Sequence, residues 1–243
     1  SAHHVGPLTV QRPFYPEGET CHLYLLHPPG GVVGGDTLDI SVRLDAKSHT
    51  LITMPGASKF YRSSGPQARL SQHFYLDEGS TLEWLPQDTI IFPGANAALR
   101  SVFHLKASST LLAWELYCLG RPVINETFSH GTLESRLEVW VEDEPRLIER
   151  QHLGDGDLTP VAGHPWIGTL LFYPANEEHL DTVRALLAPL GHFAGATLTD
   201  ELLSVRFLSH DNLICQRVMR DIWQSLRPLL TTKTACSPRI WQT

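Results

Sequence analysis

Glycine and proline gather in one loop of this 243-residue sequence, and the loop ends in an acidic residue. The stretch LHPPGGVVGGD covers residues 26–36 and holds Gly30, Gly31, Gly34, Gly35 and Asp36. The prolines fix the chain direction and the glycines permit positive φ, so the backbone can turn sharply twice. The spacing is not G-x-G-x-x-G and no lysine follows, so a phosphate cradle at a helix N-terminus is not indicated. Asp36 either caps N–H groups of this loop or points its carboxylate into a shared cavity.

A second loop, residues 54–65, places a nucleophile beside a base among small residues. Ser58 is followed directly by Lys59. Such a pair could carry out acyl transfer, but no G-x-S-x-G elbow is present and oxyanion donors would also be needed. A hydrolase that uses Ser58 is therefore kept as an alternative.

Two carboxylates lie inside segments that otherwise have the character of strands. Glu115 interrupts an apolar run, and Glu149 lies in a shorter strand-like segment. A buried carboxylate without a partner is unfavourable, so each must be paired, protonated, or exposed to water or a cation. Pairing with Arg62, Arg121 or Arg150 stays open. A hydrated cavity and a carboxylate pair that acts as acid and base in a hydrolase stay open as well.

Composition limits the possible partners. The chain has 19 Lys plus Arg against 26 Asp plus Glu, a formal charge of −7, which argues against a nucleic-acid-binding surface. No apolar run approaches the roughly 18–20 residues that cross a bilayer, so no membrane partner is expected. The chain starts at Ser1 without a leader-like stretch, and we expect its natural start to be missing.

Cysteine and histidine are spread along the chain. Four cysteines, none in a C-x-x-C pair, predict neither a zinc ribbon nor a dithiol redox site and fit a reducing cytoplasm. The 13 histidines include no H-x-H or H-x-x-x-H spacing. No stable metal site is therefore predicted.

Strand follows strand over the first two thirds of the sequence. Residues 38–44 and 133–141 alternate between apolar and polar side chains, which is typical of half-buried strands. The run 111–119 is apolar on both faces, which predicts a central strand covered on both sides. Further strands are expected at 21–27, 50–54, 69–76, 81–85, 99–105 and 147–152. The pattern predicts a mainly β fold of stacked, predominantly antiparallel sheets.

Two helices are predicted in the C-terminal half, near residues 177–188 and 212–227. Asn176 and Asp211 are suitable N-caps, and an apolar stripe repeats along the second helix. No polar linker divides the chain. We expect one domain over residues 1–243, composed of a β-rich body (1–165) and a β/α portion packed on it (166–243).

Several segments together resemble one known family. They are LHPPGGVVGGD at 26–36, MPGASKFYRS at 54–63, WLPQDTIIFPGA at 84–95, CLGRP at 118–122, FSHG at 128–131 and NLICQRVMRDIW at 212–223. These segments closely resemble the urease accessory protein UreD family, called UreH in some bacteria, and its enterobacterial members most of all. The resemblance covers essentially the whole chain.

The resemblance implies a non-enzymatic nickel metallochaperone scaffold with a β-helix-like body that carries two helices. It implies direct binding to UreF, contact with the GTPase UreG through UreF, and docking on the urease apoprotein. The family's expected route for transient nickel is a hydrated internal passage. The matching positions here are Asp36, Ser58, Glu115 and Glu149, and no stably bound cofactor is expected.

The residue chemistry is compatible with a conduit. Imidazole and thiolate hold nickel tightly, whereas isolated carboxylates and waters bind first-row divalent ions weakly. At position 115 the enterobacterial pattern often has Asp, so Glu115 keeps the carboxylate but reaches one methylene further. A plain ligand-binding β module is the third alternative.

Overall fold

A computed structural model describes residues 3–242. Within that range the chain forms sixteen strands, two α-helices and four short 3₁₀ helices. The strands are β1 (Thr9–Val10), β2 (Phe14–Glu17), β3 (Thr20–Leu26), β4 (Thr37–Leu44), β5 (His49–Thr53), β6 (Ser58–Phe60), β7 (Ala68–Leu76), β8 (Thr81–Trp84), β9 (Thr89–Ile91), β10 (Asn96–Leu105), β11 (Thr110–Leu119), β12 (Thr132–Val141), β13 (Glu144–Gly154), β14 (Trp166–Tyr173), β15 (Ala194–Thr199) and β16 (Leu202–Ser209). The helices are α1 (Glu177–Leu187), α2 (Asn212–Thr231), η1 (Pro122–Ile124), η2 (Thr159–Val161), η3 (Ala188–Phe193) and η4 (Arg239–Gln242).

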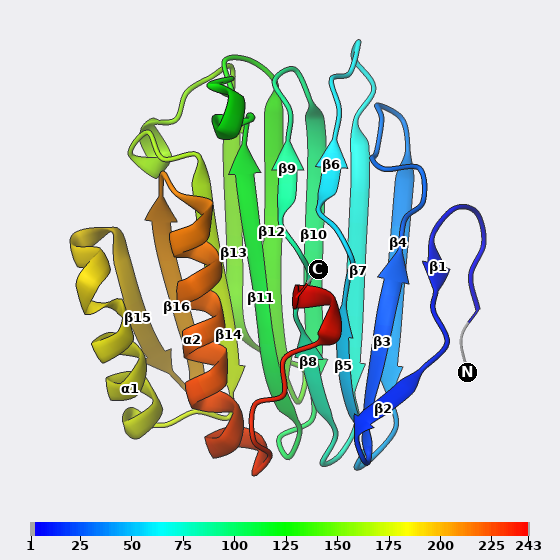
Figure 1. The fold of residues 1–243 in the computed structure, drawn as a ribbon, viewed down its shortest axis with the longest axis vertical. Helices are drawn as coiled ribbons and strands as arrows, with labels where there is room; N and C mark the ends of the chain where they lie inside the picture. The colour runs from blue at the N-terminus through cyan, green and yellow to red at the C-terminus, as the bar shows by residue number, and fades with distance from the viewer. Residues whose placement is uncertain (1–2, 243) are drawn as a thin grey trace.

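Two stacked sheets make up the body (Figure 1). The large sheet runs β1-β3-β5-β8-β11-β14-β16-β15, with β2, β6 and β9 attached, and the small sheet runs β13-β12-β10-β7-β4. From β3 to β12 the chain passes back and forth between the two sheets, as in a β-solenoid. The prediction of a mainly β fold with stacked sheets and two helices is confirmed.

The direction of strand pairing differs from the prediction. Within the solenoid the neighbours are parallel: β3 with β5, β5 with β8, β8 with β11, β4 with β7, β7 with β10, and β10 with β12. Antiparallel pairs lie at the two ends, at β1–β3, β2–β3, β12–β13, β11–β14, β14–β16 and β15–β16. Each turn of a solenoid repeats the direction of the previous one, so the next strand in a sheet is parallel although it is half-buried like an antiparallel strand.

Both helices cover the large sheet and have the predicted caps. The Asn176 side chain accepts the His179 N–H, and His179 Nδ1 accepts the Asn176 N–H, which completes a capping box. Asp211 accepts the N–H of Leu213 at 2.7 Å. α2 continues to Thr231, beyond the predicted end at 227, because Pro228 lies inside the helix instead of ending it. No helix in the described range is long and apolar enough to cross a membrane.

The core has two layers, separated by the large sheet. Alternate residues of β11 show this: Leu111 and Ala113 pack between the sheets, whereas Leu112 and Trp114 pack beneath the helices. The prediction of a strand covered on both faces is confirmed for β11. Because β14 pairs with β11, the portion from residue 166 onward continues the same sheet.

Candidate functional site

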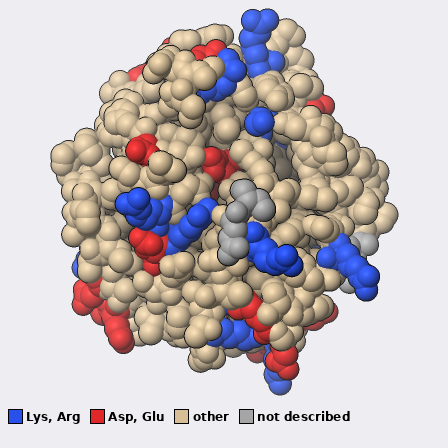
Figure 2. Space-filling view, in the orientation of Figure 1, with Lys and Arg blue, Asp and Glu red and all other residues tan. Residues whose placement is uncertain are grey.

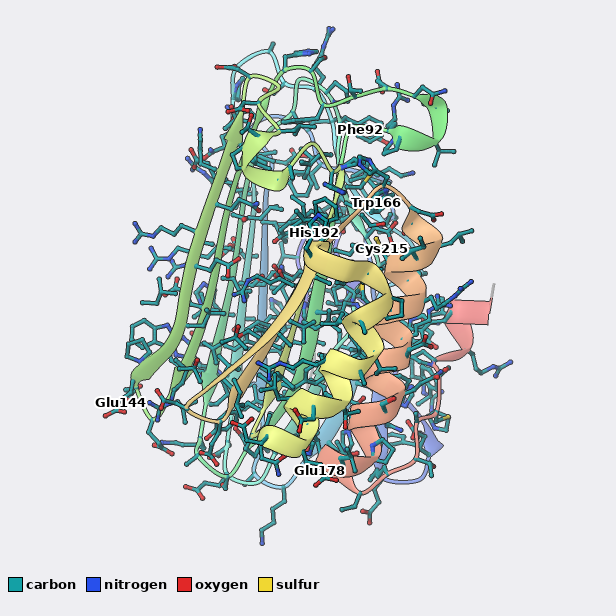
Figure 3. All side chains as sticks on the ribbon, turned by 90° about the vertical axis from the view of Figure 1, so that its left-hand side faces the viewer. Phe92, Glu144, Trp166, Glu178, His192 and Cys215 are labelled. Carbon is teal, nitrogen blue, oxygen red and sulfur yellow. The ribbon has the colours of Figure 1, made fainter. Side chains whose placement is uncertain are left out.

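A cavity of about 400 Å³ lies between the two sheets, and both carboxylates singled out in strands line it. Glu115 comes from β11 of the large sheet and Glu149 from β13 of the small sheet. η2 and η3 also contribute to the lining. Figure 3 faces this side of the molecule, with η3, marked by His192, at the upper end of α1.

The register of the large sheet positions one wall of the cavity. Glu115 on β11 pairs with Thr169 on β14, which in turn pairs with Arg206 on β16. The three residues therefore form one row across neighbouring strands, each about 4.8 Å from the next. All three line the cavity.

The small sheet supplies a second polar row at the same level. Gln72, Ser101, Leu137 and Glu149 follow one another in register across β7, β10, β12 and β13. Gln72 and Ser101 are polar although they are buried and point inward. The inward positions on either side of them along β7 and β10 hold leucine or phenylalanine. A polar layer thus interrupts the apolar core.

Hydrogen bonds link the two rows at Glu115. Gln72 Nε2 donates to Ser101 Oγ at 3.0 Å, and Ser101 Oγ donates to Glu115 Oε1. The Tyr117 hydroxyl donates to Glu115 Oε2 at 2.7 Å. No described residue forms an ion pair with this carboxylate. Burial raises the pKa of Glu115, and the nearby charge of Glu149 raises it further, whereas the two hydroxyls act in the opposite direction.

Glu149 differs from Glu115 because it has a cation partner. Arg206 Nε donates to Glu149 Oε2 at 2.8 Å, and Nη2 contacts the same oxygen. The partner is thus Arg206 rather than Arg62, Arg121 or Arg150. Both side chains are more than one-third exposed, so this ion pair is accessible at the cavity mouth.

Ser58 and Asp36 lie away from this cavity. Ser58 lines a separate cavity of about 270 Å³, and its hydroxyl faces Met54 Sδ at 3.9 Å. No hydrogen bond to a general base is found among the described partners of Ser58, so the geometry gives the hydrolase alternative at this residue no support. Asp36 is exposed and accepts the N–H of Val33 at 3.0 Å, which caps the glycine loop.

The four loop glycines serve two different purposes. Gly30 and Gly35 have φ of +77° and +94°, the left-handed region that glycine tolerates best. Gly31 and Gly34 lack positive φ but are approached closely. A Cβ at Gly31 would lie 2.2 Å from Cε2 of Tyr61, and one at Gly34 would lie 2.8 Å from the carbonyl oxygen of Pro66.

Sequence reasoning did not find a buried ion network beneath α2. Glu83 is 0 % exposed and accepts hydrogen bonds from His49, Trp223 and Arg227. Arg227, also 0 % exposed, donates to Glu17 at 2.7 and 2.9 Å. Burial alone raises the pKa of Glu83, but His49 and Arg227 outweigh it and hold this pKa below its usual range. The network connects α2 to β2, β5 and β8, so its role is structural.

The described part of the chain holds no cluster of three or more His, Cys, Asp or Glu side chains arranged to bind a metal ion. Its four cysteines are all free. A cation in the cavity would therefore meet single carboxylates, hydroxyls and water.

Comparison with known proteins identifies the family of this chain. A family model described as UreD urease accessory protein matches residues 1–242. The urease accessory protein UreD of Enterobacter sp. (strain 638) is 77 % identical over 243 residues, which cover 100 % of this chain and 89 % of that protein. UreD of Klebsiella aerogenes is 70 % identical over 243 residues, covering 100 % and 90 %. UreD of Pseudomonas putida (strain GB-1) is 55 % identical over 240 residues, covering 99 % and 87 %.

Proposed function

Because this chain belongs to the UreD family of urease accessory proteins, we propose that it carries nickel to the urease active site through the cavity at Glu115. Family membership implies a role in urease maturation, and an accessory protein of this kind implies a non-catalytic factor. Nickel is the transported cargo and not a resident cofactor.

The observation that carries the proposal is the environment of Glu115. Its carboxylate borders a cavity, accepts hydrogen bonds from two hydroxyls, has no cation partner in the part of the chain that the structure describes, and lies opposite a second carboxylate. Such a group attracts a divalent cation, yet a single carboxylate holds it weakly enough to release it. The hydroxyls of Ser101 and Tyr117 orient the carboxylate when no cation is bound to it.

The charge balance of the cavity changes when a cation enters it. Burial raises the pKa of Glu115, which favours its neutral form more than in an exposed glutamate, whereas a bound cation favours the ionised carboxylate. Arg206 neutralises Glu149 at the mouth, so the cation meets one free carboxylate rather than two. This arrangement favours passage over trapping.

The other two expected positions enter the proposal differently. Ser58 lies on a second cavity that would have to join the first to form a continuous route. Asp36 caps a loop at the surface, so we assign it to shaping the entrance rather than to binding nickel inside.

We further propose that UreF binds this chain directly, that UreG is recruited through UreF, and that the assembly docks on the urease apoprotein in the cytoplasm. Large exposed apolar side chains support partner binding, among them Val33 and Tyr61 on loops and Val123 and Ile124 on η1. Most of the surface seen in Figure 2 is uncharged, with small mixed groups of acidic and basic residues.

Glu115 and Glu149 also keep one enzymatic alternative open. A carboxyl group with a raised pKa beside an ionised carboxylate in the same cavity is the arrangement of an acid–base hydrolase. The two functions differ in a cell that carries the urease structural genes and all other accessory genes but no UreD. Only a maturation factor restores urease activity there, and a chain that co-purifies with UreF yet restores none contradicts the proposal.

A further inference from the structure

The two sheets differ in what covers their outer faces. α1 packs on β15 and β16, and α2 packs on β11, β14 and β16, so both helices lie on the large sheet. No helix among residues 3–242 lies on the outer face of the small sheet, which is on the left of Figure 3. This bare face of β13-β12-β10-β7-β4 is available to another molecule.

Arginines gather at mid-height on the bare face. Arg100 on β10 pairs in register with Arg136 on β12, which pairs with Arg150 on β13. Arg69 lies on β7 beside them. Three arginines in one row are unusual, because like charges directly opposite each other on neighbouring strands destabilise a sheet.

The carboxylates nearby do not balance this row. Arg100 and Arg136 share one buried carboxylate, Glu138, with Arg100 Nη2 at 2.9 Å and Arg136 Nε at 2.7 Å from the same oxygen. Arg150 has no acidic partner among the described residues, and Arg69 bonds only the Gln67 side chain, at 3.0 Å. A second carboxylate, Glu134, also lines this part of the face and contacts Gln67 and His152. With four arginines against Glu134 and Glu138, the patch is locally positive on a chain of charge −7.

The face is also hollowed at this point. A depression of about 520 Å³ lies over small residues, Ser71 and Ala98, with the four arginines among its lining. This volume is in the range of pockets that bind ligands with several functional groups, and it is larger than a single oxyanion needs. The row from Arg100 to Arg150 spans two strand spacings, about 10 Å, which matches two or three carboxylates of one segment.

We propose that this arginine groove, formed by Arg69, Arg100, Arg136 and Arg150, docks an acidic segment of a partner protein. Bidentate pairing of guanidinium with carboxylate would satisfy the donors that Glu138 leaves free and relieve the repulsion within the row. A long polyanion fits less well, because the acidic remainder of the surface repels it. The inference rests on the proposed function in one respect, which is that the partner is sought in the urease-maturation assembly.

The direct experiment measures peptide binding to the full chain by fluorescence anisotropy. The probe is a labelled peptide of alternating glutamate and serine, and the matched peptide carries glutamine instead. The variant R69E/R150E removes the two arginines that have no carboxylate partner, so Glu138 keeps its own. The control R12E/R184E changes the net charge equally at two exposed positions outside the groove.

The groove predicts that the glutamate peptide binds more tightly than the glutamine peptide. R69E/R150E should weaken binding about tenfold or more, whereas R12E/R184E should change it less than about twofold. Equal weakening by both pairs would show a general charge effect and overturn the proposal. Displacement of the peptide by inorganic phosphate at the same concentration would indicate a small-anion site and would overturn it too. If R69E/R150E does not fold, as judged by circular dichroism, the neutral pair R69Q/R150Q replaces it.

A second experiment places the groove in the maturation assembly. The R69E/R150E chain should lose one of the proteins that co-purify with the wild-type chain, and R12E/R184E should keep them all. If the wild-type chain matures urease and R69E/R150E still retains every co-purifying protein, docking in the groove is contradicted. Failure of the wild-type chain to restore urease would instead count against the proposed function and leave the peptide result unchanged.

Discussion

The ion network beneath α2 gives a stability prediction whose size follows from its contacts. Arg227 is fully buried and pairs with both Glu83 and Glu17, so Arg227→Met leaves both carboxylates without their guanidinium. Removal of one partner from a buried ion pair costs about 3–5 kcal/mol. For a chain of this length each kcal/mol lowers Tm by about 2–4 °C, so we expect Tm to fall by about 6–20 °C.

Glu83→Gln should cost less than Arg227→Met. Arg227 keeps both hydrogen bonds to Glu17, so the remaining charge is still paired. The effect should also depend on pH. The pKa of Glu83 lies below its ordinary value of 4.5 in the folded chain, so its stabilising contribution is complete at neutral pH and is lost as the pH falls below that value. The difference in Tm between wild type and Glu83→Gln should therefore become smaller as the pH falls below 4.5.

Thermal unfolding followed by circular dichroism tests both statements. Glu142→Gln is the control, because it breaks an ion pair with Lys106 whose side chains are 46 % and 47 % exposed, and its Tm should stay near that of wild type. An Arg227→Met variant no less stable than this control would refute the view that the network fastens α2. A larger decrease in Tm for Glu83→Gln than for Arg227→Met would refute the expected order of the two effects.

Three further predictions concern the loop and the thiols. Gly34→Ala should lower Tm in the same assay, because the new methyl group would lie 2.8 Å from the carbonyl oxygen of Pro66; an unchanged Tm would contradict this contact. Asp36→Asn should still mature urease, since the amide oxygen can accept the same N–H, whereas a loss of activity equal to that of Asp36→Ala would show that the charge itself is needed. Burial raises the pKa of Cys118 to about 12 and that of Cys215 to about 11, so neither thiol should react with a disulfide reagent near pH 8 until the chain is unfolded; rapid labelling of the folded protein would contradict their burial.

Local features of the fold could be predicted from the sequence, because they depend on nearby residues. Asn176 and Asp211 marked both helix starts through their capping side chains. The alternation at 38–44 and 133–141 marked strands. Alternation reports which face of a strand is buried and not which strand comes next, so the parallel solenoid was missed. The predicted end of the second helix at residue 227 lies directly before Pro228, whereas the helix continues to Thr231 with this proline inside it.

The candidate site could be predicted only in part. Glu115 and Glu149 were identified as carboxylates within strands, and the structure brings them to one cavity. Arg206 could not be found because it lies 57 residues from Glu149 and on the other sheet, so the two side chains meet only where the stacked sheets face each other. Gln72 and Ser101 had a detectable signal, since each is polar at an inward position between apolar neighbours.

The nickel content of urease tests the central claim most directly. Urease matured with wild type, Glu115→Leu or Glu115→Gln would be purified, its nickel per active site measured, and the assembly checked by pull-down. Leucine removes the oxygen ligand and narrows the cavity, whereas glutamine keeps the size and one oxygen. The account predicts that nickel falls most with Glu115→Leu and less with Glu115→Gln while the complex stays assembled. Unchanged nickel with Glu115→Leu would remove Glu115 from the route, and a greater loss with Glu115→Gln would contradict its role as a transient oxygen ligand.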